Sequence, residues 1–187
     1  MHKFLGIGRD CSIWSGAHIV GAEYIRVGNA VTIDDYCFIY ARAYITLGDF
    51  VHICAFSSIT GGEACEVGPF SSLSWGARVF TGTENLKKLL GPKIPLDLRE
   101  AVRKPVTIGK HVLIGANSVI LPGAHIHDGA IIGASSVVRQ DQEIAPWTVW
   151  GGVPAHYIYA RDRQLILAAE EQLRKRYYHN GVYIGAV

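Results

Sequence analysis

Isoleucine, leucine or valine recurs every sixth residue along most of this chain. The first four groups of three begin 20 residues apart, which is three hexads plus two residues; they are Ile7, Ile13 and Ile19, then Val27, Ile33 and Ile39, then Leu47, Ile53 and Ile59, then Val67, Leu73 and Val79. A second series follows without slippage: Ile108, Ile114, Ile120, Ile126, Ile132 and Val138. Such repeats bury their apolar faces only by stacking on one another. The period predicts short strands, three to a coil, stacked into a triangular prism around a column of aliphatic side chains.

A second pattern occupies the position two residues before each aliphatic residue. Most of these positions hold small or β-branched residues, and the exceptions Leu5, Ile25 and Ile45 each open a coil. Small residues let the chain turn a corner close to the axis of the prism. The residue after the aliphatic is often glycine, at positions 8, 28, 48, 68, 109, 115 and 133. We expect unusual backbone dihedral angles at these glycines.

These hexads carry the hexapeptide-repeat pattern, and over nearly its whole length the sequence resembles the left-handed β-helix acyltransferases. The resemblance implies an all-β fold, a left-handed parallel β-helix of about six coils over roughly residues 7–143. Its handedness comes from the resemblance alone, because crossover sterics favour right-handed connections. We expect residues 1–158 to form the acyltransferase domain, with a long loop at residues 80–105 after the fourth coil. Residues 159–187 are expected to form a C-terminal α-helix and tail.

Composition limits the partners that such a domain can have. The 187 residues include 21 Gly and 1 Met, a mix typical of a turn-rich β architecture, and 18 Lys+Arg stand against 16 Asp+Glu. The net charge of +2 gives no concentrated basic surface for nucleic acid or for an anionic membrane. The first ten residues lack the apolar core of a signal peptide, and no later apolar run approaches the length of a membrane span. We expect a soluble cytoplasmic protein with no nucleic-acid or membrane partner.

The four cysteines predict core packing rather than a disulfide or metal motif. No C-x-x-C is present, and Cys11, Cys37 and Cys65 occupy the small inward position of the repeat. Cys54 is expected to be more exposed, with His52 as its nearest activating partner. The γ-type carbonic anhydrases, one hexapeptide branch, bind zinc through two histidines five residues apart. No such pair occurs among His2, His18, His52, His111, His125, His127, His156 and His179, so we expect no metal.

The loop and the C-terminal segment stand outside the repeat. A loop as long as residues 80–105 inside a regular solenoid is usually functional. The resemblance implies that this loop lies over the cleft between two subunits of a homotrimer and helps to form the acceptor site. Residues 159–178 have a helical pattern, which we expect to cap the end of the solenoid or to contact another subunit. Its apolar stripe and possible ion pairs involve Leu165, Ala169 and Leu173, and Glu170 or Glu171 with Arg174 or Lys175.

The resemblance also implies acetyl-CoA or another acyl-CoA as co-substrate. Acyl transfer to a hydroxyl or an amine passes through a tetrahedral intermediate, which backbone N–H groups stabilise. Small residues allow the pantetheine arm of coenzyme A to approach the backbone. A cationic side chain suits one of its phosphates. In this family a Gly-x-Pro-Ala signature borders the adenine. The corresponding candidates are Gly115, Ala116, Gly133 and Ala134, then Arg139, then Pro154 and Ala155.

The loop contains no histidine, and this absence bears on the acceptor. Hydroxyl-acylating relatives use a histidine near the acceptor cleft as general base, and where some sugar O-acetyltransferases read Gly-Thr-His-Asp this chain reads Gly-Thr-Glu-Asn at residues 82–85. An alcohol needs a base in the transition state, whereas an amine with a pKa of about 8 is partly neutral and already nucleophilic. The chain therefore favours amine acceptors, with Glu84 positioning the amine.

The loop, and the coil at residues 32–40, resemble those of N-acyltransferases that act on nucleotide-linked amino-deoxy sugars. By this resemblance Ser74 and Glu84 border the acceptor amine and carry catalysis. The same resemblance suggests that the nucleotide sugar is bound by Asp34, Tyr36, Trp75 and Arg99, with the Arg99 guanidinium suited to a diphosphate. The function implied is N-acylation of such a sugar for a bacterial surface polysaccharide.

Two alternatives stay open at this point. One is an O-acetyltransferase of a sugar or small molecule, whose base would be a histidine outside the loop, such as His52 or His111. The other is a non-catalytic β-helix that serves assembly and does not bind acetyl-CoA. The sequence does not specify the nucleotide, the sugar, the amine or the acyl chain.

Overall fold

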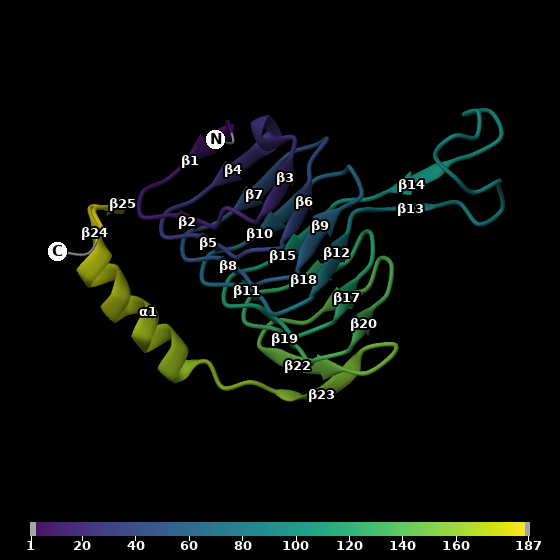
Figure 1. The fold of residues 1–187 in the computed structure, drawn as a ribbon. Coiled ribbons are helices and arrows are strands. Elements are labelled where there is room, and N and C mark those ends of the chain that lie inside the picture. Colours follow the sequence, from purple (N-terminus) through teal and green to yellow (C-terminus); the bar gives the residue numbers. More distant parts are fainter. Residues whose placement is uncertain (1–2, 186–187) are drawn as a thin grey trace.

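The computed structural model describes residues 3–185 and has the shape of a three-sided prism (Figure 1). Within these residues each side is a parallel sheet with one strand from each coil. The first sheet consists of β1 (Gly6–Ile7), β4 (Ile25–Val27), β7 (Ile45–Leu47), β10 (Cys65–Val67), β15 (Val106–Ile108), β18 (His125–Ile126) and β21 (Glu143–Ile144). The second consists of β2 (Ser12–Ile13), β5 (Thr32–Ile33), β8 (His52–Ile53), β11 (Ser72–Leu73), β16 (Leu113–Ile114), β19 (Ile131–Ile132) and β22 (Thr148–Gly151). The third consists of β3 (His18–Val20), β6 (Phe38–Tyr40), β9 (Ser58–Thr60), β12 (Arg78–Phe80), β17 (Val119–Ile120) and β20 (Val137–Val138).

The stack confirms the expected parallel β-helix and is longer than expected. Six coils have a strand in all three sheets, and β21 and β22 add a seventh turn beyond residue 143. There the chain reverses, because β23 (His156–Ala160) pairs antiparallel with β22 and ends the second sheet. A short 3₁₀ helix, η1 (Ala22–Tyr24), joins the first and second coils.

The core is the column of aliphatic residues that the six-residue period predicts. Ile33, Ile53 and Leu73 lie in register on neighbouring coils and are fully buried. The small position is also inward: Cys37, Ser57 and Cys65 are buried, and all four cysteines, which lie within the described residues, are free thiols. Ile7 is an exception at 51% exposed, because no coil covers the first one.

The glycines that follow the aliphatic residues have a different role from the one expected. None of the seven, all within the described residues, has a positive φ; left-handed angles fall two residues later, at Asp10, Ala30, Phe50 and their equivalents. A Cβ atom on Gly68 would lie 2.5 Å from the backbone of Gly109 in the next coil. Six of the seven glycines, all but Gly133, are therefore required by the close approach of stacked coils. The expectation of unusual dihedral angles was wrong.

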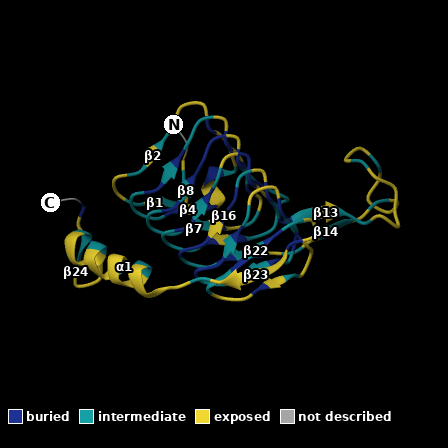
Figure 2. Cartoon of the chain, turned by 90° about the horizontal axis from the view of Figure 1, so that it is seen from below, coloured by how far each residue is buried: buried dark blue, intermediate teal, exposed yellow. Residues whose placement is uncertain are grey.

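The loop at residues 80–105 leaves the prism as a hairpin (Figure 1). Its stem is β13 (Gly82–Glu84) paired antiparallel with β14 (Ala101–Arg103). The tip between these strands is mostly exposed, whereas the prism interior is buried (Figure 2). The stem fixes the position of Glu84 relative to the coils.

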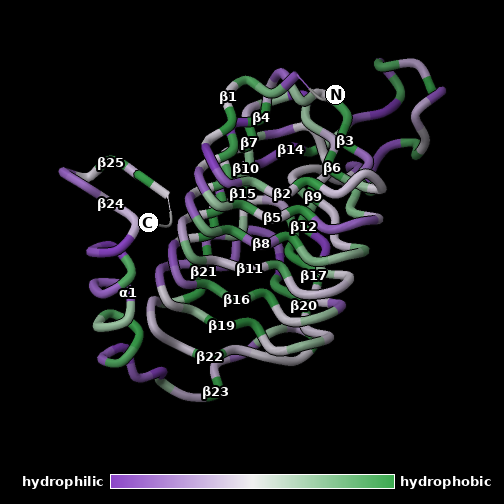
Figure 3. The backbone as a smooth tube through the Cα atoms, turned by 60° about the vertical axis from the view of Figure 1, so that its left-hand side comes forward, coloured by the Kyte–Doolittle hydropathy of each residue, from purple (hydrophilic) through white to green (hydrophobic). Residues whose placement is uncertain are grey.

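The C-terminal helix α1 (Gln164–Tyr177) runs beside the prism, from the end that holds β22 back toward the end that holds β1 (Figures 1 and 3). It begins later than expected because Tyr157 and Tyr159 pair with β22 instead. The predicted apolar stripe was wrong, since Leu165 is 83% exposed while Ile166, Glu170, Leu173 and Tyr177 are half-buried. The helix therefore does not cap the end of the prism. Both predicted ion pairs form, Glu170 with Arg174 and Glu171 with Lys175.

Side-chain contacts fasten α1 and the hairpin of β24 (Tyr178–His179) and β25 (Val182–Tyr183) to the coils. Glu170 lies 2.6 Å from His111, and the hydroxyls of Tyr178 and Tyr183 donate to Asp49 and Asp10. These contacts join the chain terminus to several coils. No helix within residues 3–185 has the length and apolar character needed to cross a membrane. Residues 1–2 and 186–187, which include His2 and the ends of the two expected regions, lie outside the described residues.

Candidate active site

One corner of the prism brings together most of the predicted site residues. We call this corner the site corner. It begins at the residue that directly follows the repeat's aliphatic residue in each strand of the second sheet. Because these strands are in register, the side chains form a column along the stack. The column is Trp14, Asp34, Cys54, Ser74, Gly115 and Gly133. It places Ser74 and two of the proposed coenzyme A residues, Gly115 and Gly133, on one edge of the molecule.

Aromatic side chains form a pocket at the upper part of the site corner. The rings of Tyr36 and Phe56 are stacked with centroids 5.2 Å apart, and Trp75 lies 6.0 Å from Phe56. The pocket has a volume of about 300 Å³ and is lined by Trp14, Asp34, Asp35, Tyr36, Ala55, Phe56 and Trp75. Three of the four residues predicted to bind the nucleotide sugar, Asp34, Tyr36 and Trp75, therefore share one aromatic pocket.

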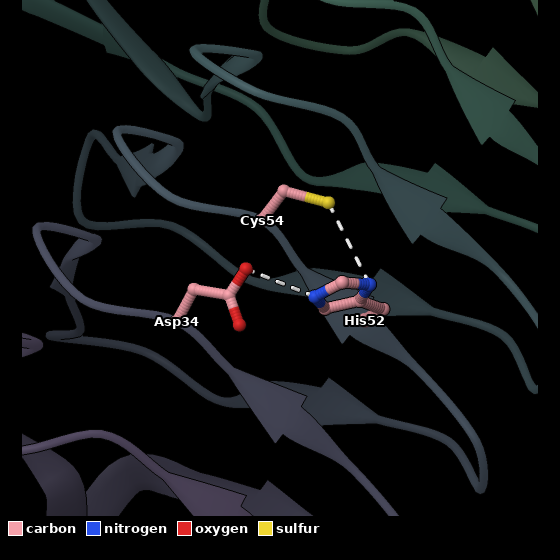
Figure 4. A group of neighbouring side chains, drawn as sticks. All are labelled: Asp34, His52 and Cys54. Atoms are coloured by element: carbon pink, nitrogen blue, oxygen red, sulfur yellow. Dashed lines mark hydrogen bonds and ion pairs between the residues drawn. The ribbon is translucent and has the colours of Figure 1, made fainter.

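Asp34 also contacts a histidine beside this pocket (Figure 4). Its Oδ2 atom lies 3.0 Å from Nε2 of His52, and Nδ1 of His52 lies 3.6 Å from Sγ of Cys54. Cys54 is only 7% exposed, so the expectation of a more exposed thiol was wrong. Burial raises the pKa of the Cys54 thiol. Sequence reasoning considered His52 and Asp34 separately, although the 20-residue coil length places residues 32 and 52, and 34 and 54, side by side.

Glu84 lies in a second cleft, between the hairpin and the prism. The cleft has a volume of about 530 Å³, and its walls include Phe80, Arg103 and Pro122. One carboxylate oxygen of Glu84 lies 3.8 Å from the guanidinium of Arg99. The other, Oε2, is buried with no hydrogen-bond partner among residues 3–185. A buried carboxylate oxygen in this state is suited to accept a hydrogen bond from a ligand.

Within one chain the two proposed catalytic residues are apart. Ser74 lies in the turn that leads into β12, and Glu84 lies on β13, after β12 has ended. Arg99 is tied to the hairpin, where its Nε donates to the carbonyl of Ile94 at 3.0 Å. The structure therefore brings Arg99 to Glu84. Asp34, Tyr36 and Trp75 line a different pocket, and Ser74 precedes Trp75 in the chain.

The proposed coenzyme A residues continue the site corner toward the last coils. The glycine at 115 is explained by packing, since a Cβ there would lie 2.5 Å from the backbone nitrogen of Ala134. A Cβ on Gly133 would meet nothing closer than 3.5 Å, so packing alone does not require glycine there. Gln142 accepts from the backbone N–H of Arg139 and donates to the carbonyl of Ala155, which connects two of the predicted segments. Ala116, Ala134, Arg139 and Pro154 are at least partly exposed.

Two groups of described side chains have the composition of metal ligands. They are Asp34, His52 and Cys54, and His125, His127 and Glu143. The two ring nitrogens of His52 face different side chains, so the ring lies between Asp34 and Cys54 and does not converge with them on one point. The second group lies on and just beyond the strands of the first sheet, with His125 and His127 half-buried and Glu143 exposed. The absence of a metal stays a prediction.

A three-sided stack of hexads with a hairpin and two clefts defines a hexapeptide-repeat transferase, and comparison with known proteins identifies its family. The model of the bacterial transferase hexapeptide (six repeats) matches residues 105–140. The dTDP-4-amino-4,6-dideoxy-D-glucose acyltransferase of Escherichia coli is 34% identical over 170 residues, which cover 87% of this chain and 85% of that enzyme.

Solved structures agree with this match. A variant of AntD, an N-acyltransferase from Bacillus cereus, in complex with dTDP-4-amino-4,6-dideoxyglucose and coenzyme A, is 32% identical, with a TM-score of 0.85 over 92% of this chain and 91% of AntD. AntD in complex with dTDP and 3-hydroxybutyryl-CoA gives the same values. This chain belongs to the hexapeptide-repeat N-acyltransferases of nucleotide-linked amino sugars. It is an acyltransferase, and its co-substrate is an acyl-CoA.

Proposed function

We propose that this protein acylates the amine of a dTDP-linked amino-dideoxy sugar, with 4-amino-4,6-dideoxyglucose as the first candidate, for a bacterial surface polysaccharide. The observation that carries this proposal is the buried, unpartnered Oε2 of Glu84 in the hairpin cleft. An unpaired buried carboxylate oxygen is costly unless a donor reaches it, and an amine supplies N–H donors. The names of the relatives in Escherichia coli and Bacillus cereus support the sugar nucleotide.

In the proposed reaction the amine nitrogen attacks the thioester carbonyl, a C–N bond forms and the C–S bond to coenzyme A breaks. Glu84 orients the amine, and Ser74 donates a hydrogen bond at the acceptor. Arg99 is suited to the diphosphate, and the pocket with Asp34, Tyr36 and Trp75 to the nucleoside. Gly115, Ala116, Gly133 and Ala134 border the pantetheine arm, Arg139 meets a phosphate, and Pro154 and Ala155 border the adenine.

We also propose that the active protein is a homotrimer. Support comes from the separation of Ser74 and Glu84 within one chain, since a second copy could bring the hairpin cleft of one protomer to the site corner of the next. In this arrangement residues 1–158 supply the catalytic surfaces, and residues 159–187 fasten or extend them. The proposed site of action is the cytoplasm.

The test is a panel of purified dTDP sugars, amino and hydroxyl, incubated with the protein and acetyl-CoA or 3-hydroxybutyryl-CoA. The readouts are thiol release and the mass of the acylated product. We expect thiol release and an amide product only with amino sugars. Release with hydroxyl-only sugars would replace the proposal by O-acylation, and no release with any sugar, together with no binding of acyl-CoA, would favour a non-catalytic role.

A further inference from the structure

The contacts of His52 with Asp34 and Cys54 indicate which nitrogen of its ring carries the hydrogen. An ionised carboxylate can only accept, so the 3.0 Å contact with Oδ2 of Asp34 makes Nε2 of His52 the ring nitrogen that carries hydrogen. The other nitrogen, Nδ1, then holds the lone pair and is the basic atom of the ring. This division of roles is the one that orients a general base in many active sites.

Cys54 does not remove that lone pair from use. Its thiol faces Nδ1 at 3.6 Å, and a thiol is a weak hydrogen-bond donor. Burial raises the pKa of the Cys54 thiol, which keeps the sulfur protonated and un-nucleophilic at neutral pH. The His52 side chain is 45% exposed, so a stronger donor can reach the ring. The titratable groups in contact with His52 are the Asp34 carboxylate and the Cys54 thiol, and Asp35 lines the same aromatic pocket as Asp34.

The group lies next to the residues proposed for acyl transfer. Cys54 precedes Ser74 by one coil in the column of the site corner. Its sulfur lies 3.9 Å from the hydroxyl of Ser72, and His52 pairs in register with Ser72. Asp34 lines the aromatic pocket. His52 therefore lies on the coil next to the one that carries Ser74.

Acylation of an amine requires a proton acceptor. An amine with a pKa of about 8 is mostly protonated near pH 7 and must lose one proton before it attacks, and the amide product requires loss of a second. An ordinary carboxylate, with a pKa of about 4.3, is a poor match for this task, whereas an imidazole titrates near neutrality. Glu84 can hold the ammonium form, and the transfer of the second proton needs a different group.

We propose that Nδ1 of His52 is the general base of this enzyme, with Asp34 as the residue that positions the ring. This rests on the proposed N-acylation. The bound ammonium first loses one proton to solvent, which leaves the neutral amine. As the amine attacks and the C–N bond forms, its second proton passes to Nδ1, and the C–S bond breaks. The imidazolium then gives its proton to the departing coenzyme A sulfur, which leaves as the thiol. Cys54 takes no part in covalent chemistry.

The main test is His52→Gln, which keeps an outward-facing polar side chain on β8. We expect kcat at pH 7 to fall about 10²-fold, a loss within the range for removal of a general base. The KM values for acyl-CoA and for the amino sugar should stay within about twofold. The deficit should shrink as pH rises and as imidazole is added, since both replace the missing base. A defect in structure alone would show neither response.

Three further variants complete the experiment. Asp34→Asn should also lower kcat, as His52→Gln does, and should change the pH profile of kcat. This variant tests the proposal if His52→Gln does not fold. Cys54→Ala should keep near-normal kcat. His125→Gln, at a half-buried histidine on the first sheet, is the matched control. Full activity of folded His52→Gln would overturn the proposal, as would an acyl adduct on Cys54 by intact mass. If the wild-type protein were inactive with every amino sugar, the proposed function itself would be overturned.

Discussion

At the scale of single residues, Glu84 is the side chain that we propose orients the acceptor amine. Its Oε2 atom is buried without a partner within the described residues, and its other oxygen lies near Arg99. A hydrogen bond to a charged group contributes about 1.5–3 kcal/mol. We expect Glu84→Gln to lower kcat/KM for the amino sugar by about 10- to 100-fold, mainly through KM. Steady-state kinetics with each substrate varied in turn would measure this.

The matched control for Glu84 is Glu100, a carboxylate on the same hairpin. Glu100 accepts a hydrogen bond from Asn85 at 2.7 Å and does not line the hairpin cleft. Glu100→Gln should leave both KM values unchanged. Equal KM values for the sugar in wild type and Glu84→Gln would remove Glu84 from the acceptor site.

At the scale of elements, the attachment of α1 depends on one buried carboxylate. The Glu170 side chain is 9% exposed and contacts His111 and Arg174. Burial by itself raises the pKa of Glu170, but hydrogen bonds from His111 and Arg174 outweigh it and lower the pKa overall. When folding lowers the pKa of a carboxyl, its ionised form stabilises the fold at every pH above its pKa in the unfolded chain. This contribution is lost as the pH falls through its pKa in the folded protein.

We therefore expect α1 to detach from the prism in acid, below about pH 4.3, before the coils unfold. Glu170→Gln should loosen α1 already at pH 7, by about 1–3 kcal/mol, because it removes charge-assisted hydrogen bonds. Hydrogen exchange of the α1 amides at pH 7 and pH 4 would report both effects. Glu171→Gln, at an exposed pair with Lys175, is the control and should change little. Equal protection of α1 in all three proteins would show that Glu170 does not hold the helix.

At the scale of the whole molecule, stability should depend on position in the stack. Ile53 is fully buried between two coils, whereas Ile7, in the first coil, is 51% exposed. Removing a buried aliphatic side chain costs about 2–5 kcal/mol, because a cavity is added to the lost transfer energy. We expect Ile53→Ala to lower the free energy of unfolding by this amount, and Ile7→Ala by less than about 1 kcal/mol. Urea denaturation would compare them, and equal losses would contradict a core closed by stacking.

The proposed arrangement of copies has its own test, because Ser74 lies in the turn before β12 whereas Glu84 lies on β13 of the hairpin. Ser74→Ala and Glu84→Ala should each be nearly inactive. If neighbouring copies share a site, co-expression of the two variants with different tags should restore part of the activity in mixed assemblies. The same mixture made from separately purified, non-exchanging assemblies should stay inactive. No recovery in verified mixed assemblies would place both residues in a site built by one chain.

The sequence by itself determined the repeat, the register and the excursion of the hairpin. Each aliphatic residue must face the axis to be buried, so the six-residue period fixes three short strands to a coil, and the interruption at residues 80–105 must leave the prism. The same logic placed Glu84 in the loop at residues 80–105, since that position depends only on local chain order. The shared corner of Ser74, Gly115 and Gly133 and the pairing of the loop into a hairpin came from the structure.

Only the tertiary structure decided how side chains from different coils meet. Six of the seven glycines that follow an aliphatic residue are needed where the next coil approaches closely. The path of α1 is set by contacts of Glu170, Tyr178 and Tyr183, whose partners lie far away in the chain. The hydrogen-bonded group of Asp34, His52 and Cys54 depends on rotamers and burial as well as on coil length. The periodicity specifies which residues face in or out, because burial of aliphatic side chains imposes it, but the direction of an outward-facing side chain is set by the neighbours it meets.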